Sequence, residues 1–241
     1  VECICPAFAK PVTGRRLMQS NLCTYDHAAR KMYATVAFSL TGGNLLKWFR
    51  DEFGQPEVQR AATGNGDAYA LLLEQLPPHP TPLQVLPYFT PSGTPYFDPH
   101  ANGAIMGLTL QTSRCEILKA LLEGVALEMR LNLDILQQSG IPVRELRATG
   151  GGSRSRRWNQ LKADILNRPL TAIAVPEAGC LGAAMLACAA RTANNTATLA
   201  TTWVKLGETF PPNPENTVQY DEKFKKYRRL YHTLKQSSID T

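Results

Sequence analysis

Apolar residues near the start of the chain follow a strand-like pattern and then a helical one. Residues typical of strands dominate 1–8, 22–25 and 33–40. In the segment 41–54, two glycines precede apolar positions at helical spacing, and Gly54 ends the run. The pattern predicts three strands followed by a helix.

The rest of the chain alternates between short apolar runs and amphipathic segments. Its periodicity predicts strands over 85–88, 103–108 and 170–175, and helices over 68–76, 113–139, 176–190 and 221–234. The small residues of 176–190 predict close packing against a sheet or a second helix. A three-strand opening followed by strand–helix units predicts an α/β fold with a mixed sheet flanked by helices. That order is typical of ribonuclease-H-like domains, which include the actin-like ATPase domains.

Three consecutive glycines separate a short apolar run from a helix within residues 146–166. They are Gly150, Gly151 and Gly152, and Ser153 or Ser155 can cap the helix. The N–H groups of a helix start attract an anion or a polar ring, and glycine lets a flat ligand lie on the backbone. A tight turn that needs only glycine's φ angles explains the same residues. The motif is neither a P-loop nor a Rossmann fingerprint.

Composition and charge exclude several classes of protein. The 241 residues suffice for one large or two small domains, with 44% hydrophobic and 19% charged residues, as in soluble proteins. The net charge is +6, but the basic cluster at 223–229 lacks interleaved aromatics, so we expect a solvated helix face and no nucleic-acid partner. No apolar run is long enough to span a membrane. The start at Val1, inside a strand-like run, suggests a piece of a longer protein.

The six cysteines show no metal-binding spacing. No pair has C-x-x-C spacing, and no histidine lies at ligand spacing to any of them. Cys115 and Cys188 fall within helical apolar patterns, which predicts buried free thiols in a reducing compartment. We therefore expect a cytoplasmic protein without a structural metal.

Four segments, in order along the chain, form a recognisable set. They are 93–99 (GTPYFDP), 103–123 (GAIMGLTLQTSRCEILKALLE), 149–169 (TGGGSRSRRWNQLKADILNRP) and 176–187 (PEAGCLGAAMLA). The second resembles the C-terminal signature of the FGGY carbohydrate kinases, and the other three are also similar to that family, most of all to its xylulokinase-like members. Four matches at the expected separations are far more specific than a glycine triplet.

The resemblance implies a function and a division of labour. Such kinases place ATP and Mg²⁺ in a cleft between two actin-like domains and phosphorylate a hydroxyl of a sugar or polyol. It implies that residues 1–241 are the C-terminal, nucleotide-binding domain. The N-terminal sugar-binding domain and the catalytic base would lie outside this chain, so we expect no catalytic residue here and no activity from the chain alone. A ketopentose such as xylulose is favoured, while the exact substrate and a homodimer stay open.

The resemblance also assigns nucleotide contacts to the central glycine stretch. Gly151 and Gly152, with Gly150 before them, match the backbone on which the adenine rests. Ser155 matches a polar side chain that reaches the adenine, although it also suits an ordinary N-cap. Asn159 is a weaker candidate, since the pattern favours a surface helix residue.

Two further nucleotide contacts are implied in the first predicted helix. Gly43 matches the glycine that approaches the phosphates, the alternative being a helix-start glycine of purely steric use. Lys47 matches a polar ATP-contacting position but replaces the glutamine of some members, and a solvated lysine is the alternative.

Asp98 is expected to form a turn before Pro99, and Glu123 to anchor its helix, rather than to act in catalysis.

Two other functions are compatible with the same elements. An actin-like ATPase that does not act on sugars, or a regulatory nucleotide-binding module, would share the strand order and the glycine turns. A scaffold that has lost its nucleotide is the third interpretation. The segment 103–123 disfavours the first of these, and the intact glycine run disfavours the last.

Overall fold

The structure is a computed structural model that describes residues 1–175, 177–192 and 195–237. At its N-terminal end, short strands form two small sheets. β1 (Glu2–Ile4) pairs antiparallel with β5 (Ala37–Ser39). The second sheet consists of β2 (Ala7–Phe8), β3 (Tyr25–Asp26) and β4 (Tyr33–Ala34), in the order β2–β4–β3. The short helix α1 (Arg15–Gln19) lies between β2 and β3 in the chain. The strands predicted over 1–8 and 33–40 are each divided in two, because the chain changes its pairing partner midway.

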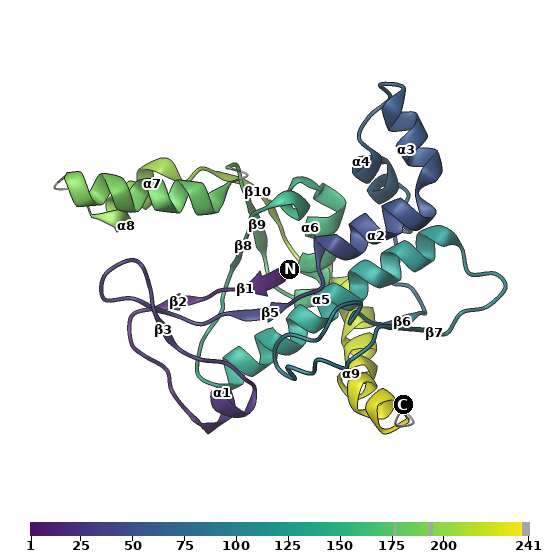
Figure 1. Ribbon diagram of the computed structural model, residues 1–241, viewed down its shortest axis with the longest axis horizontal. Helices are drawn as coiled ribbons and strands as arrows, with labels where there is room; N and C mark the ends of the chain where they lie inside the picture. The colour runs from purple at the N-terminus through teal and green to yellow at the C-terminus, as the bar shows by residue number, and fades with distance from the viewer. Residues whose placement is uncertain (176, 193–194, 238–241) are drawn as a thin grey trace.

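Three helices follow and form the lobe at the top right of Figure 1. They are α2 (Gly43–Phe53), α3 (Gln55–Ala62) and α4 (Ala68–Glu74). α2 ends at Gly54 and buries Leu45, Leu46 and Phe49, as its spacing predicts. The sequence pattern did not predict α3, which begins with a proline in its first turn, where proline is tolerated. Asp67 caps α4 by accepting a hydrogen bond of 3.0 Å from the Ala70 backbone N–H.

The long helix α5 (Arg114–Gln138) runs through the middle of the molecule (Figure 1). Ser113 and Glu116 form a capping box at its start. Before it, β6 (Gln84–Leu86) and β7 (Ala104–Met106) pair antiparallel. The buried surface of α5 is wider than the single apolar stripe that its pattern predicts. Polar residues such as Glu128 and Asn132 are buried as well.

The central glycine stretch lies between a strand and a helix, as predicted. β8 (Leu146–Ala148) leads to a 3₁₀ turn, η1 (Gly151–Arg154), and then to α6 (Arg156–Leu166). β8 pairs parallel with β9 (Leu170–Ile173), which pairs antiparallel with β10 (Leu206–Phe210), so this sheet is mixed. The pattern did not predict β10, four of whose five residues are exposed. The α/β class is confirmed, although the described strands form four small sheets rather than one.

The small-residue helix packs against a second helix, one of the two partners that its composition predicts. α7 (Ala178–Arg191) contacts α8 (Thr196–Trp203), and the two extend away from α5 as a pair (Figure 1). Met185 is the buried residue of α7 in the described part of the chain. Pro176, with which the predicted helix begins, lies outside the described residues.

The last helix, α9 (Pro214–Ser237), packs against α5 and α6. It begins at Pro214 rather than at Asp221, because the Asn213 side chain accepts a hydrogen bond of 2.9 Å from the Glu215 N–H. The solvated face predicted for 223–229 is wrong in part: Lys223 is buried and donates to the Thr81 carbonyl at 2.9 Å.

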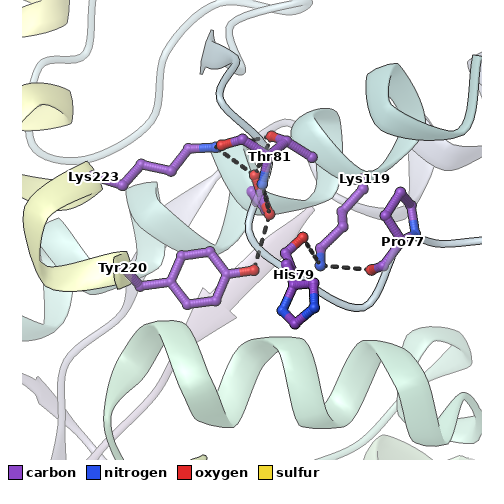
Figure 2. A network of polar contacts seen from close by, with 7 residues as sticks. Pro77, His79, Thr81, Lys119, Tyr220 and Lys223 are labelled. Carbon is purple, nitrogen blue, oxygen red and sulfur yellow. Dashed lines mark hydrogen bonds and ion pairs between the residues drawn. The ribbon is translucent and has the colours of Figure 1, made fainter. Parts of the chain in front are cut away.

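A buried polar network joins α9 to α5 and to the loop before β6. Figure 2 shows Lys223 reaching Thr81, while Lys119 reaches the carbonyls of Pro77 and His79. The Glu123 carboxylate accepts hydrogen bonds from the Thr81 hydroxyl at 2.6 Å, from the Tyr220 hydroxyl at 2.9 Å, and from Lys223. Glu123 therefore anchors its helix, as predicted.

Candidate functional site

A cleft of about 1070 Å³ lies where the lobe of helices meets the glycine turn. Four predicted site residues line it: Gly43, Gly151, Gly152 and Ser155. The remaining lining residues were not predicted from the sequence and come from α2, α4 with its cap, η1 and the start of α6: Leu46, Asp67, Tyr69, Ala70, Leu73, Glu74, Arg154, Arg156, Arg157 and Trp158. The fold thus brings two glycine segments into one cleft, although more than 100 residues of sequence separate Gly43 from Gly151.

The three glycines of the turn differ in whether the structure requires a glycine at that position. Gly150 has φ 83° and ψ −174°, a conformation that is essentially confined to glycine. A Cβ on Gly151 would meet no atom within 4 Å, so this glycine leaves its backbone open. A Cβ on Gly152 would lie 3.0 Å from the indole ring of Trp158. The steric explanation therefore suffices for Gly150 and Gly152, whereas nothing steric requires glycine at 151.

Ser155 caps α6 and also lines the cleft. Its Oγ accepts a hydrogen bond of 3.2 Å from the Trp158 backbone N–H, as the N-cap interpretation predicts. The hydroxyl proton is still able to donate to a ligand, because a serine hydroxyl is both donor and acceptor. The two interpretations of Ser155 are therefore compatible.

Asn159 is buried, so the expectation of a surface residue is wrong. Its Nδ2 donates to the Ser153 carbonyl at 2.7 Å, and its Oδ1 has no partner among the described residues. The Ser153 hydroxyl in turn donates to the Gly150 carbonyl at 2.7 Å. Asn159 is not among the lining residues of the cleft. Asn159 therefore stabilises the glycine turn through its hydrogen bond to Ser153 and does not contact the cleft itself.

Gly43 and Lys47 have different surroundings despite lying one turn apart on α2. A Cβ on Gly43 would meet no atom within 4 Å, whereas one on Gly42 would lie 2.8 Å from the backbone of Val1. Close packing therefore requires glycine at position 42, whereas the backbone of Gly43 is open to the cleft. The Lys47 side chain is 62% exposed, pairs with Asp51 at 2.6 Å, and is not among the lining residues.

Charged groups of both signs line the cleft. Arg154, Arg156 and Arg157 stand beside the glycine turn, while α4 and its cap contribute the carboxyl groups of Asp67 and Glu74. Arg157 donates to the Leu76 carbonyl at 3.1 Å and so joins α6 to the end of α4. Arg156 pairs with Glu208 at 2.5 Å. Arginine side chains in a cleft suit a phosphorylated ligand.

Asp98 has a structural role away from the cleft. It accepts hydrogen bonds of 2.9 Å from the His100 N–H, 2.7 Å from the Tyr231 hydroxyl and 2.8 Å from Lys235. These donors hold the pKa of Asp98 well below its usual value. The predicted turn before Pro99 is confirmed.

No built metal site is found in the part of the chain that the structure describes. No group of three or more histidine, cysteine, aspartate or glutamate side chains there could hold a metal ion. All six cysteines are free, but Cys115 and Cys188 are only half-buried, so the prediction of buried thiols there is wrong in part. No helix in the described ranges is long and apolar enough to cross a bilayer.

Comparisons with known proteins agree with this architecture. Residues 6–191 match the FGGY family of carbohydrate kinases, C-terminal domain. A xylulose kinase of Staphylococcus epidermidis is 27% identical over 227 residues, which cover 92% of this chain and 43% of that protein. A glycerol kinase of Bordetella parapertussis is 33% identical over 205 residues, which cover 77% of this chain and 39% of that protein.

Solved structures give the same result. The crystal structure of a xylulose kinase from Rhodospirillum rubrum superposes with a TM-score of 0.79 at 30% identity, covering 97% of this chain and 45% of that one. The chain belongs to the FGGY family of carbohydrate kinases, and its fold is that of the family's actin-like domains. It spans less than half the length of these relatives.

Proposed function

We propose that this chain provides the nucleotide-binding part of an ATP-dependent carbohydrate kinase. The observation that supports this most is the joint lining of one cleft by Gly43, Gly151 and Gly152. Two of these backbones, at Gly43 and Gly151, have open space where a side chain would stand. Backbone exposed in this way is suited to close contact with a flat base and with phosphates.

The two glycine segments suit different parts of ATP. Among the described residues no side chain caps α2. The Leu45 N–H donates to the Gly42 carbonyl at 3.0 Å, whereas the N–H groups of Gly43 and Asn44 at the helix start are positioned to bind phosphate oxygens, helped by the helix dipole. The glycine turn at Gly151 accommodates the adenine ring, within reach of the Ser155 hydroxyl. ATP supplies the γ-phosphoryl group, and Mg²⁺ would be held mainly by the phosphates, as is usual for that ion. Gly150, Lys47 and Asn159 stay weaker predictions, because none of them lines the cleft.

The acceptor is a sugar or polyol, and we favour a ketopentose such as xylulose. This preference is supported by the relatives named xylulose kinase, while the glycerol kinases among the relatives make a polyol the alternative. Phosphoryl transfer depends on positioning and electrostatics rather than on covalent chemistry by the protein. The chain would position the nucleotide, and we expect no sugar phosphorylation by these 241 residues alone. The free cysteines agree with a cytoplasmic location.

Calorimetric titration with ATP–Mg²⁺ tests this proposal. The wild-type chain should bind, and Gly151→Val should weaken binding at least tenfold, because its side chain would fill the open space over the backbone. Gly182→Val is the matched control, since Gly182 also lies in a helix and its Cβ would meet no atom within 4 Å. Equal affinities of the wild type and Gly151→Val, or no binding by the wild type, would overturn the proposal.

A further inference from the structure

The α4 side of the cleft carries an aromatic ring to which no function has been assigned. Tyr69 lies in the first turn of α4 and lines the same cleft as Gly151 and Gly152. It is partly buried and packs against the main hydrophobic core. Its ring is therefore held by the fold and does not swing freely in solvent.

A second contact fixes the Tyr69 ring. The guanidinium of Arg50 lies over it, with Cζ 4.7 Å from the ring centroid. Arg50 is itself held by Asp51, whose Oδ1 accepts a hydrogen bond of 2.8 Å from Arg50 Nε. Arg50 covers one face of the ring, and the part of Tyr69 that lines the cleft is the part available to a ligand. Tyr69 is thus oriented before any ligand arrives.

The lobe that carries Tyr69 is also fixed to the body of the protein. At the start of α5, Arg114 donates to both carboxylate oxygens of Glu57, at 2.6 Å and 3.0 Å. Gln75, at the end of α4, donates to Glu57 at 2.8 Å. Glu57 is buried, and the Arg114 contact lowers the pKa of its carboxyl to about 2. This clamp between α3, α4 and α5 keeps the α4 wall at a set position relative to α5.

We infer that Tyr69 is a base-binding residue, whose ring packs on the purine of a nucleotide that rests on the Gly151–Gly152 backbone. The inference depends on the proposed function, because it names the group that contacts the base in the same cleft. A bare glycine backbone offers close approach but little apolar area, whereas a fixed aromatic ring supplies stacking with any base. The ring thus supplies the apolar contact that the glycine wall lacks.

Titration of three ligands against matched variants tests this inference. The variants are Tyr69→Phe, which keeps the ring, and Tyr69→Leu, which removes it but keeps an apolar side chain. Tyr25→Leu is the control, because Tyr25 is exposed on β3 and does not line the cleft. The ligands are ATP–Mg²⁺, ADP–Mg²⁺ and inorganic tripolyphosphate, the last of which has no base.

Tyr69→Leu should weaken ATP and ADP binding about tenfold, a typical loss for one base–aromatic stack. Tyr69→Phe and Tyr25→Leu should stay within about twofold of the wild type, and tripolyphosphate should bind every variant alike. Unchanged ATP affinity in Tyr69→Leu, with a loss in Gly151→Val, overturns the inference and leaves the proposed function standing. Equal losses for ATP and tripolyphosphate also overturn it, because they indicate a general structural effect. No ATP binding by the wild type overturns both.

Discussion

Gly152 and Trp158 are packed so closely that a side chain on Gly152 would press against the indole ring. A Cβ on Gly152 would lie 3.0 Å from Cζ3 and 3.2 Å from Cε3 of the indole. The ring cannot easily give way, because Trp158 is buried and Lys162 lies over it, with Nζ 4.6 Å from its centroid. This contact fastens the glycine turn to α6.

The first prediction concerns this contact. Gly152→Ala should destabilise the fold by about 1–3 kcal/mol, because overpacking forces shifts in a tightly packed site. Gly151→Ala should change the free energy of unfolding by less than about 0.5 kcal/mol, because its side chain meets open space. Urea unfolding followed by tryptophan fluorescence compares the two variants. Similar stabilities would contradict the packing described here.

The second prediction concerns the backbone at Gly150. Its φ of 83° and ψ of −174° lie in a region that is essentially confined to glycine. Gly150→Ala should therefore destabilise the fold by about 1–3 kcal/mol even though its Cβ would meet no neighbouring atom. Gly179→Ala, in the exposed helix α7, should have the opposite sign, because alanine favours helices. Thermal unfolding of both variants measures the difference, and a neutral Gly150→Ala would show that the turn has another conformation.

The third prediction concerns the buried pair of Glu123 and Lys223. Lys223→Met should destabilise the protein by about 3–5 kcal/mol, because it leaves a carboxylate buried without its cation. The double variant Glu123→Gln/Lys223→Met should be less destabilised than Lys223→Met alone, since it removes both charges. A double-mutant cycle from urea unfolding gives the coupling. Simple additivity would mean that the two groups do not interact.

The fourth prediction is a pH dependence centred on Glu128. Its carboxyl is buried in the core, which raises its pKa from 4.5 to about 7, although hydrogen bonds from Tyr227 and Tyr88 act in the opposite direction. The folded state therefore holds this proton more tightly than the unfolded state. Its stabilising contribution is complete below pH 4.5 and is lost as the pH rises to about 7, by a few kcal/mol.

Glu128→Gln should flatten the stability profile in that range, because glutamine does not titrate. Glu57 has the opposite sign and a separate window: its pKa is lowered to about 2 by Arg114, so its contribution is present above pH 4.5 and is lost as the pH falls. Urea unfolding at half-unit steps between pH 4.5 and 7.5 tests this. A wild type whose stability does not fall on passing from pH 5 to pH 7 would contradict the assignment to Glu128.

Local sequence patterns predicted the parts of the site that depend on local backbone. The glycines at 43, 151 and 152 and the cap at Ser155 could be found because each belongs to a strand-to-helix turn with its own signature. Tyr69 and Asp67 could not, because only the packing of α4 beside the turn brings them to the cleft. The periodicity of a sequence does not indicate that α4 packs beside the glycine turn.

The sequence pattern also failed to predict which polar residues are buried. By helical spacing alone, Asn159 and Lys223 both resemble solvated helix residues, yet both are buried. Each has a partner that its own helix does not reveal: the Ser153 carbonyl for Asn159, and Glu123 of α5 for Lys223. The burial of a polar group depends on whether such a partner exists. Sequence analysis of one helix therefore cannot predict it.

The central claim is that the nucleotide lies in the cleft between α2, α4 and the glycine turn. Selective ¹⁵N-glycine labelling tests it directly, because the 17 glycines are spread along the whole chain. On addition of ATP–Mg²⁺, the amide signals of Gly43, Gly151 and Gly152 should shift most, while those of Gly14 and Gly182 should stay unchanged. Shifts concentrated on α7, or on glycines outside the cleft, would contradict the account.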